Sequence, residues 1–162
     1  LLAGIVLDTK NFTMRTGGRT FEAAAFLRRN GADVVRVRKL FRDRVEDYRA
    51  RAEAVRRAEI FEKEFAISEC PSEGLESPTV IGAQAANELL NIIGIKASFV
   101  MTQVKDTIFF SARSIDEVNV QVMMEKLGGG GNAATAGAQV KNHTVQQTLD
   151  ELLQSINKFY ES

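Results

Sequence analysis

Four consecutive glycines are the most unusual stretch of this chain, and they follow an apolar, helix-like run: Gly128, Gly129, Gly130 and Gly131. Glycines at the start of a helix let backbone N–H groups approach an anion with no Cβ in the way. A flexible loop is the alternative. Flexible linkers, however, usually carry serine and other polar residues rather than the small residues that follow Asn132. The pattern favours a phosphate cradle at the start of a short helix beginning near Asn132.

Arginine and serine side chains supply further candidate contacts to an anion. Arg113 lies between Ser111 and Ser114 near the end of an expected strand, where it points either at an anionic ligand or at solvent. Arg15 and Arg19 flank a glycine pair in the N-terminal part of the chain. Arginines in such a loop could hold phosphate oxygens, although surface salt bridges explain them equally well.

A single carboxylate is the candidate metal ligand. Asp8 comes at the end of the apolar run 1–9, which is typical of a buried strand. The carboxyl end of a strand in an α/β sheet is where ligands bind, and a hard oxygen ligand suits Mg²⁺ or Mn²⁺. A turn or helix cap is the alternative. Because His143 and Cys70 are the only histidine and cysteine, multi-histidine and cysteine zinc sites are excluded from this chain alone.

Composition limits the function classes. The chain has 162 residues, of which 44% are hydrophobic, enough for one mid-sized domain or two small ones. Basic and acidic residues number 21 each, so no general electrostatic attraction draws the chain to DNA or to an acidic membrane. A lone cysteine fits a reducing, cytoplasmic setting. The chain begins with Leu-Leu, and we expect it to be a piece of a longer protein.

The elements that must position these residues are mixed, which predicts an α/β fold. In the N-terminal part we expect the strand over 1–9, whose partner strands are missing. A helix follows, with Thr20 as N-cap, with Ala24, Phe26 and Leu27 buried, and with its end at Asn30-Gly31. We expect the segment 32–41 to be extended.

A helix over 41–65 is the longest periodic pattern, with an apolar stripe formed by Phe41, Val45, Tyr48, Ala52 and Val55. Charged pairs at i,i+4, such as Glu53 with Arg57, favour a solvated connector between two lobes. A nucleic-acid-binding helix is the weaker alternative because acidic residues alternate with the basic ones.

The second lobe is predicted to start near residue 66. Here we expect a helix over 80–94, a hairpin of two strands around Lys105-Asp106, a helix over 116–127 and a strand over 136–140. In the C-terminal segment we expect an amphipathic helix capped by Thr144.

Taken in order, three stretches resemble the DHH phosphoesterases, and most closely the bacterial membrane-bound cyclic-di-AMP phosphodiesterases of the GdpP type. The stretches are "AGIVLDTKNFTMRTGGRTFEAAAFLRRNGAD", "SARS" and "KLGGGGNAATAGAQ". The resemblance implies the end of a DHH catalytic lobe over 1–40, a long connector helix over 41–65 and a small mixed-sheet DHH-associated lobe over 66–162. Substrate would bind in the cleft between the lobes, with the glycine run and Asp8 facing each other across it.

The resemblance also implies roles for individual residues. Asp8 would hold one of two Mn²⁺ ions of the complete protein. Nucleotide would contact Ser111, Arg113, Ser114, the four glycines and Asn132. The implied reaction is hydrolysis of cyclic-di-AMP to linear pApA, in the cytoplasmic domain of a membrane-anchored bacterial protein. The membrane would be reached only through missing N-terminal segments, no DNA partner is expected, and a homodimer is one option.

Two departures from the family pattern bear on activity. Asn132 stands where the family loop has a histidine, and an amide can neither carry a proton nor a positive charge. The Asp-His-His triplet and the other upstream metal ligands are absent, so we expect the fragment alone to be inactive. The alternatives are an oligonucleotide phosphoesterase such as a RecJ-like exonuclease, and a nucleotide-binding module without catalysis.

Overall fold

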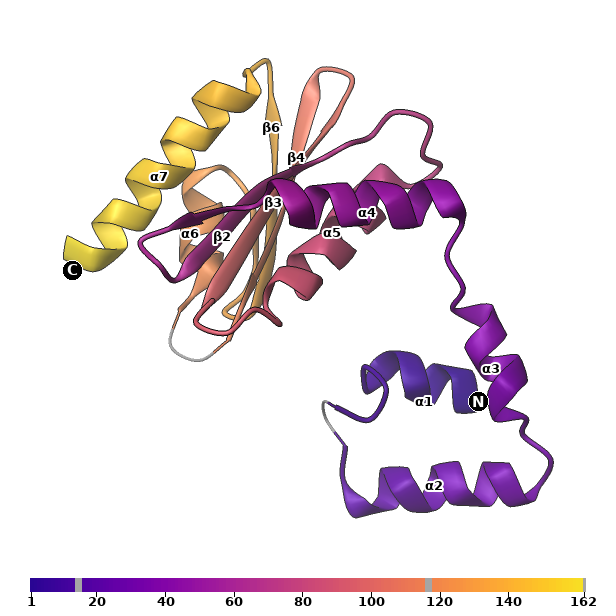
Figure 1. Cartoon of the computed structure of the whole chain (residues 1–162). Coiled ribbons are helices and arrows are strands. Elements are labelled where there is room, and N and C mark those ends of the chain that lie inside the picture. Colours follow the sequence, from indigo (N-terminus) through magenta and orange to yellow (C-terminus); the bar gives the residue numbers. More distant parts are fainter. Residues whose placement is uncertain (14–15, 116–117, 162) are drawn as a thin grey trace. The chain divides into compact units, whose positions relative to one another are not determined.

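The computed structural model describes residues 1–13, 16–115 and 118–161 in two compact units, Leu1–Asp43 and Arg44–Ser162. Arg15, one of the candidate phosphate contacts, lies outside the described residues. Helices and strands are intermixed along the described residues (Figure 1), which confirms the predicted α/β class.

The first unit is helical in its described residues and contains α1 (Leu2–Asp8), α2 (Gly18–Arg29) and α3 (Val34–Leu40). The predicted strand over 1–9 and the extended segment over 32–41 are therefore wrong. A strand needs a neighbouring strand for its backbone hydrogen bonds, and no described residue of this unit offers one, whereas a helix satisfies its own. In α3 the Asp33 carboxylate also caps the start, accepting from the N–H groups of Val35 and Arg36.

Helix α2 confirms the predicted helix and its end but not its start or its buried face. The N-cap is Gly17 instead of Thr20, and the chain leaves the helix through Asn30 and Gly31, with Gly31 at φ +94°. None of its residues is buried, and Phe26 is 59% exposed.

The second unit contains one six-stranded sheet with the order β1-β2-β3-β4-β6-β5. Strands β2 and β3 run parallel, and every other neighbouring pair is antiparallel. The strands are β1 (Glu59–Phe61), β2 (Phe65–Cys70), β3 (Ala97–Val104), β4 (Thr107–Ser114), β5 (Gly130–Asn132) and β6 (Thr135–Lys141). The helices are α4 (Val45–Arg57), α5 (Pro78–Leu89), α6 (Val120–Lys126) and α7 (Val145–Glu161).

Helix α4 is much shorter than the predicted helix over 41–65, and it buries a different face. Ala50 and Ala54 are buried, whereas Val45 and Tyr48 of the predicted stripe are 58% and 60% exposed. Alanines allow the helix to lie close to the sheet, where the Ser68 hydroxyl donates to the Ala54 carbonyl at 2.5 Å. The predicted Glu53–Arg57 pair is present on the outer side.

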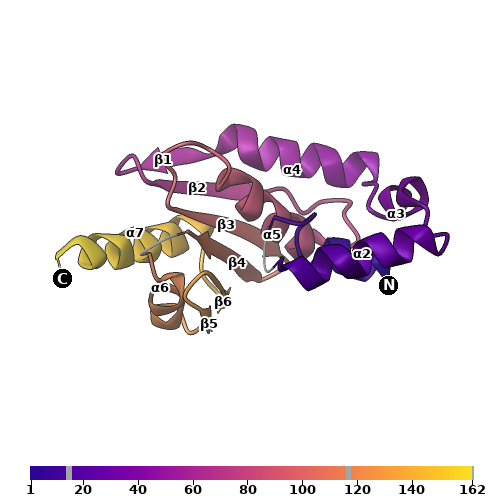
Figure 2. The ribbon, with the colours of Figure 1, turned by 90° about the horizontal axis from the view of Figure 1, so that it is seen from below.

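Helices cover both sides of the sheet, with α4 and α5 on one side and α6 and α7 on the other (Figure 2). In β2 and β3, alternate residues enter the two layers because successive side chains point to opposite faces. In β3, Phe99 packs on the α6–α7 side and Val100 on the α4–α5 side. Strand β6 buries only Ala136, Ala138 and Val140, on the α6–α7 side, and its opposite face is not buried.

Several predicted elements of the second unit are confirmed. Strands β3 and β4 form the expected hairpin, with Lys105 at φ +56° in its turn. Helices α5 and α6 and strand β6 lie where expected, with shorter bounds for the helices. Helix α7 begins at a cap in which Thr144 accepts from the Gln147 N–H, and the Gln147 side chain accepts from the Thr144 N–H.

Candidate functional site

The strand register gathers several predicted site residues on one face of the sheet. Ser111 of β4 is paired with Gly137 of β6, which is paired with Gly130 of β5. Arg113 is likewise paired with Thr135, and Thr135 with Asn132. Directly paired residues project to the same face of a sheet. Ser111 and Arg113 therefore share a face with the site of Gly130 and with the Asn132 side chain. This face of β4, β6 and β5 is named the open face here.

Ser114 is separated from the other members of its motif. It is buried in the layer opposite the open face, and its hydroxyl donates to the Ala133 carbonyl at 2.9 Å. The reason is the two-residue period of the strand, which sends residues 111 and 113 to one side and 114 to the other. Ser114 thus holds the turn between β5 and β6 and is not on the face that carries Arg113.

The Arg113 guanidinium is a half-buried cation at the border of the open face. Its Nε donates to the Asn87 Oδ1 at 3.1 Å, and its Nη1 donates to the Ala112 carbonyl at 2.8 Å. Among the described residues no carboxylate pairs with it, and three of its five N–H groups have no protein acceptor. Burial lowers the pKa of Arg113, because desolvation disfavours the charged form. A cation held in this way is well suited to receive an anion.

The predicted helix after the glycine run is wrong, because residues 130–141 form the β5–β6 hairpin. The first two glycines end helix α6 instead. Gly128 has φ +77° and donates to the Glu125 carbonyl, and the Gly129 N–H donates to the Met124 carbonyl. Two N–H groups of the predicted cradle are thus already used within the chain.

Close packing explains two of the four glycines, and Gly130 is different. A Cβ at Gly129 would lie 2.7 Å from the Ala138 Cα, and one at Gly131 would lie 2.5 Å from the Ala136 Cα. Both positions exclude any side chain. A Cβ at Gly130 would meet nothing within 4 Å. Packing within the described residues therefore does not require a glycine at this position.

Asn132 uses its side-chain oxygen to build the hairpin turn. Its Oδ1 accepts from the N–H groups of Ala134, at 3.1 Å, and Thr135, at 2.9 Å. This leaves the amide NH₂ group at an exposed position beside the open face. A hollow of about 380 Å³ lies nearby, lined by Phe109, Phe110, Gly128, Gly129, Gly137, Ala138 and Gln139.

The candidate residues of the first unit are placed less favourably for chemistry. Asp8 is the exposed last residue of α1, so the strand end predicted for it is wrong. Arg19 is exposed in the first turn of α2. The part of the chain that the structure describes contains no group of three metal-ligating side chains of the His, Cys, Asp or Glu type. Asp8 alone does not make a manganese site.

The family model of the DHHA1 domain matches residues 64–162. The chain belongs to the DHHA1 family. The cyclic-di-AMP phosphodiesterase GdpP of Geobacillus thermodenitrificans is 47% identical over 162 residues, and PdeA of Listeria monocytogenes is 44% identical over 161. The matches cover 99% of this chain and 24% of each relative. The chain therefore spans about a quarter of the length of these relatives.

Solved structures support the fold. The chain superimposes on an exopolyphosphatase-related protein from Bacteroides fragilis with a TM-score of 0.84 at 17% identity, covering 96% of this chain and 48% of the other. No described helix has both the length and the apolar character that crossing a bilayer would require.

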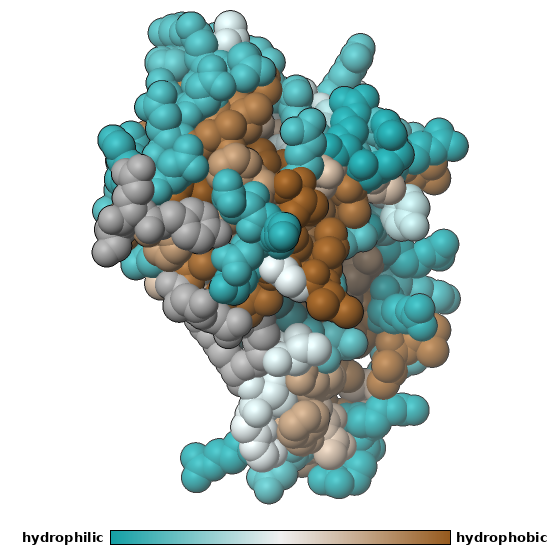
Figure 3. Space-filling model, turned by 60° about the vertical axis from the view of Figure 1, so that its left-hand side comes forward, coloured by the Kyte–Doolittle hydropathy of each residue, from teal (hydrophilic) through white to brown (hydrophobic). Residues whose placement is uncertain are grey.

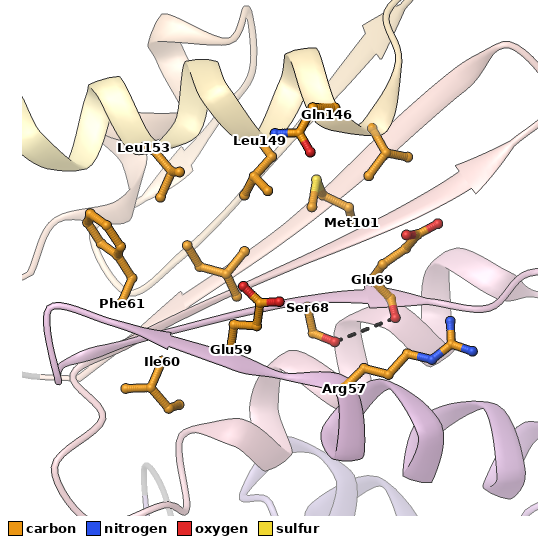
Figure 4. Close-up of a pocket in the computed structure, with 12 residues that line it drawn as sticks. Arg57, Glu59, Ile60, Phe61, Ser68, Glu69, Met101, Gln146, Leu149 and Leu153 are labelled. Carbon is orange, nitrogen blue, oxygen red and sulfur yellow. Dashed lines mark hydrogen bonds between the residues drawn. The ribbon is translucent and has the colours of Figure 1, made fainter.

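A second hollow, in the unit Arg44–Ser162, has a different character. A groove of about 440 Å³ lies between α7 and strands β1 and β2 (Figure 4), and sequence reasoning missed it. Figure 3 shows apolar surface between polar side chains on the face turned forward there. Glu59 and Glu69 line the groove, and its one lining arginine, Arg57, is paired with Glu53. An apolar groove with two carboxylates is unsuited to a phosphate group.

Sequence reasoning also missed Gly137 of the open face and Asn87 of α5, which contacts Arg113 at its border. Asn87 was read only as part of a helix, and Gly137 only as part of a short strand. Their positions depend on helix packing and strand register, which no local pattern in the sequence encodes.

Proposed function

We propose that this chain is the DHHA1-containing part of a phosphodiesterase that hydrolyses cyclic-di-AMP to linear pApA, and that the open face binds a phosphodiester group of the substrate. The relatives that carry the name cyclic-di-AMP phosphodiesterase support the substrate class. The single observation that carries the site is Arg113, a half-buried guanidinium without a carboxylate partner in the described chain.

Each residue of the open face has a distinct task in this proposal. The remaining N–H groups of Arg113 donate to two phosphate oxygens, a geometry that a planar guanidinium provides and a lysine does not. The Ser111 hydroxyl and the Asn132 amide donate from neighbouring positions. Gly130 and Gly137 place no side chain on the open face, so that a phosphate can approach the backbone. Positive charge held in place stabilises the charge that develops on these oxygens during displacement at phosphorus.

The proposal assigns only part of a Mn²⁺ site to this chain. The described residues do not form a manganese centre, and we assign to this chain at most one ligand, the carboxylate of Asp8. Bound Mn²⁺ would supply an activated water in the complete protein. We further propose that the complete protein is anchored in a bacterial membrane with this region in the cytoplasm.

The test compares turnover and binding in the complete protein with Mn²⁺. We expect hydrolysis of cyclic-di-AMP to pApA, and Arg113→Ala should weaken nucleotide binding by about 1–3 kcal/mol, the range for a lost hydrogen bond to a charged group. Arg56→Ala removes an exposed arginine on α4 and is the matched control, expected to bind as the wild type does.

Three results would contradict the proposal. Unchanged affinity in Arg113→Ala would remove the open face as the phosphate site. Hydrolysis of linear oligonucleotides alone would favour a RecJ-like exonuclease. Binding of cyclic-di-AMP without Mn²⁺-dependent hydrolysis would favour a nucleotide-binding module.

A further inference from the structure

Helix α5 lies close to strand β3 at two points along its length. Gly82 sits directly over the Thr102 side chain, where a Cβ would collide with the hydroxyl. One turn later the buried Ser98 hydroxyl donates to the Ala86 carbonyl at 2.6 Å. Ser98 is the strand partner of Arg113. These contacts fix the height and rotation of α5 above β3 and β4.

Asn87 follows the anchored Ala86, and its amide therefore reaches the guanidinium. The Asn87 Oδ1 accepts from the Arg113 Nε at 3.1 Å, while the Ala112 carbonyl accepts from Nη1 at 2.8 Å. Two acceptors on different sides of the planar guanidinium fix both the orientation of its plane and its rotation within that plane. A long, four-bond side chain would otherwise lose considerable rotamer entropy on binding a ligand.

The chemical type of the acceptor also matters. A carboxylate at this position would form an ion pair with Arg113 and neutralise much of its charge. An amide oxygen orients the guanidinium with a neutral group and so adds no negative charge beside it. Burial makes this charge more effective, because a half-buried site is less screened by solvent than a surface site.

We propose that Asn87 is a positioning residue: it aims the Arg113 guanidinium at the phosphodiester without adding a negative charge that would offset it. This inference rests on the proposed function of the open face. It names a residue on α5, outside both the glycine run and the β4 motif, as a determinant of phosphate affinity.

The experiment uses the complete protein and measures KM and kcat for cyclic-di-AMP over a series of salt concentrations. Asn87→Ala removes the acceptor and should raise KM about tenfold, with a salt dependence like that of the wild type. Asn87→Asp keeps the size and the hydrogen bond but adds a negative charge. It should also raise KM, and in addition flatten the dependence of KM on salt, because the charge of the Arg113–Asp pair is compensated.

Controls separate positioning from folding. Asn91→Ala removes an exposed asparagine just beyond α5 and should leave KM unchanged. Thermal unfolding of each variant establishes that the chain is folded at the assay temperature. A wild-type KM in Asn87→Ala, or a wild-type salt dependence in Asn87→Asp, overturns the proposal.

A double-mutant cycle distinguishes this inference from the proposed function. If Asn87 acts through Arg113, then Asn87→Ala should have no further effect in the Arg113→Ala background. An Arg113→Ala variant with wild-type binding overturns the proposed site itself. Weak binding in Arg113→Ala together with normal binding in Asn87→Ala overturns only the positioning role.

Discussion

One face of the sheet changes from core to open surface across a single row of paired residues. Val100 of β3 is fully buried under helix α5, and its partner Ser111 on β4 is half-buried. The row then continues to Gly137 and Gly130, which are also half-buried. The neighbouring row runs from the buried Ser98 through the half-buried Arg113 to exposed residues of β6 and β5.

We call the part of this face under helices α4 and α5 the covered half, and the open face of β4, β6 and β5 the open half. The difference between the two halves explains how a candidate site arises on an ordinary strand. Both halves have the same pleat and the same alternation of side chains. Helix coverage alone decides which outward residues become core. Arg113 stands at the border, where its charge is partly shielded from solvent and its side chain is exposed enough to meet a ligand.

The largest expected effect tests the covered half. Leu89 of α5 is completely buried, and Leu89→Ala should lower the free energy of unfolding by about 2–5 kcal/mol through lost burial and a cavity. Gln139→Ala on the open half, the matched change at an exposed position, should stay within about 0.5 kcal/mol. Urea unfolding of both variants measures the difference, and equal midpoints would remove the distinction between the halves.

A smaller effect separates two adjacent glycines. Gly129→Ala forces a methyl group against Ala138, and we expect a loss of about 1–3 kcal/mol of unfolding free energy. Gly130→Ala has open space around its methyl group and should remain within about 1 kcal/mol of the wild type.

The same pair also separates packing from binding. In the complete protein, Gly130→Ala should weaken cyclic-di-AMP binding about tenfold, because the methyl group occupies the surface that the phosphate approaches. A normal affinity in this variant would remove Gly130 from the floor of the site.

The smallest effect concerns the thiol of Cys70, which is buried in the covered half. Cys70 is buried in the α4–α5 layer, and burial raises the pKa of its thiol to about 11. At pH 8 it should react with a maleimide far more slowly than in the urea-unfolded chain, because little thiolate is present and access is blocked.

The pH dependence of stability follows from the same shift. Because the folded state binds the Cys70 proton more tightly than the unfolded state, this contribution to stability is complete below the ordinary thiol pKa of 9.0 and is lost as the pH rises toward 11. Rapid maleimide labelling of Cys70 in the native protein at pH 8 would contradict the prediction of slow labelling, because it would show that the layer between the sheet and helices α4 and α5 is accessible.

Local sequence signals predicted the elements that depend on local chemistry. The turn at Lys105-Asp106 with apolar strands on both sides predicted the β3–β4 hairpin, and Thr144 predicted the start of α7. Prediction failed where the partner of a segment decides its structure. An apolar run at 1–9 suits a strand as well as a helix, and the described first unit offers no strand to pair with it.

The candidate site divides in the same way. Arg113 and Ser111 were found from residue type, but their separation from Ser114 required the strand assignment and its period. The glycine run was recognised as unusual, yet the division of its members between a helix end, close packing and open surface depends on the hairpin that follows.

By itself, the sequence determined which side chains and backbone freedoms were available: an arginine flanked by serines, a run of glycines, and neutral net charge. Only the tertiary structure decided that Arg113 is half-buried without a carboxylate partner in the described chain, and that Asn87 holds it. The reason is physical: charge compensation and desolvation depend on distances between segments remote in sequence, and packing of helices on the sheet sets those distances.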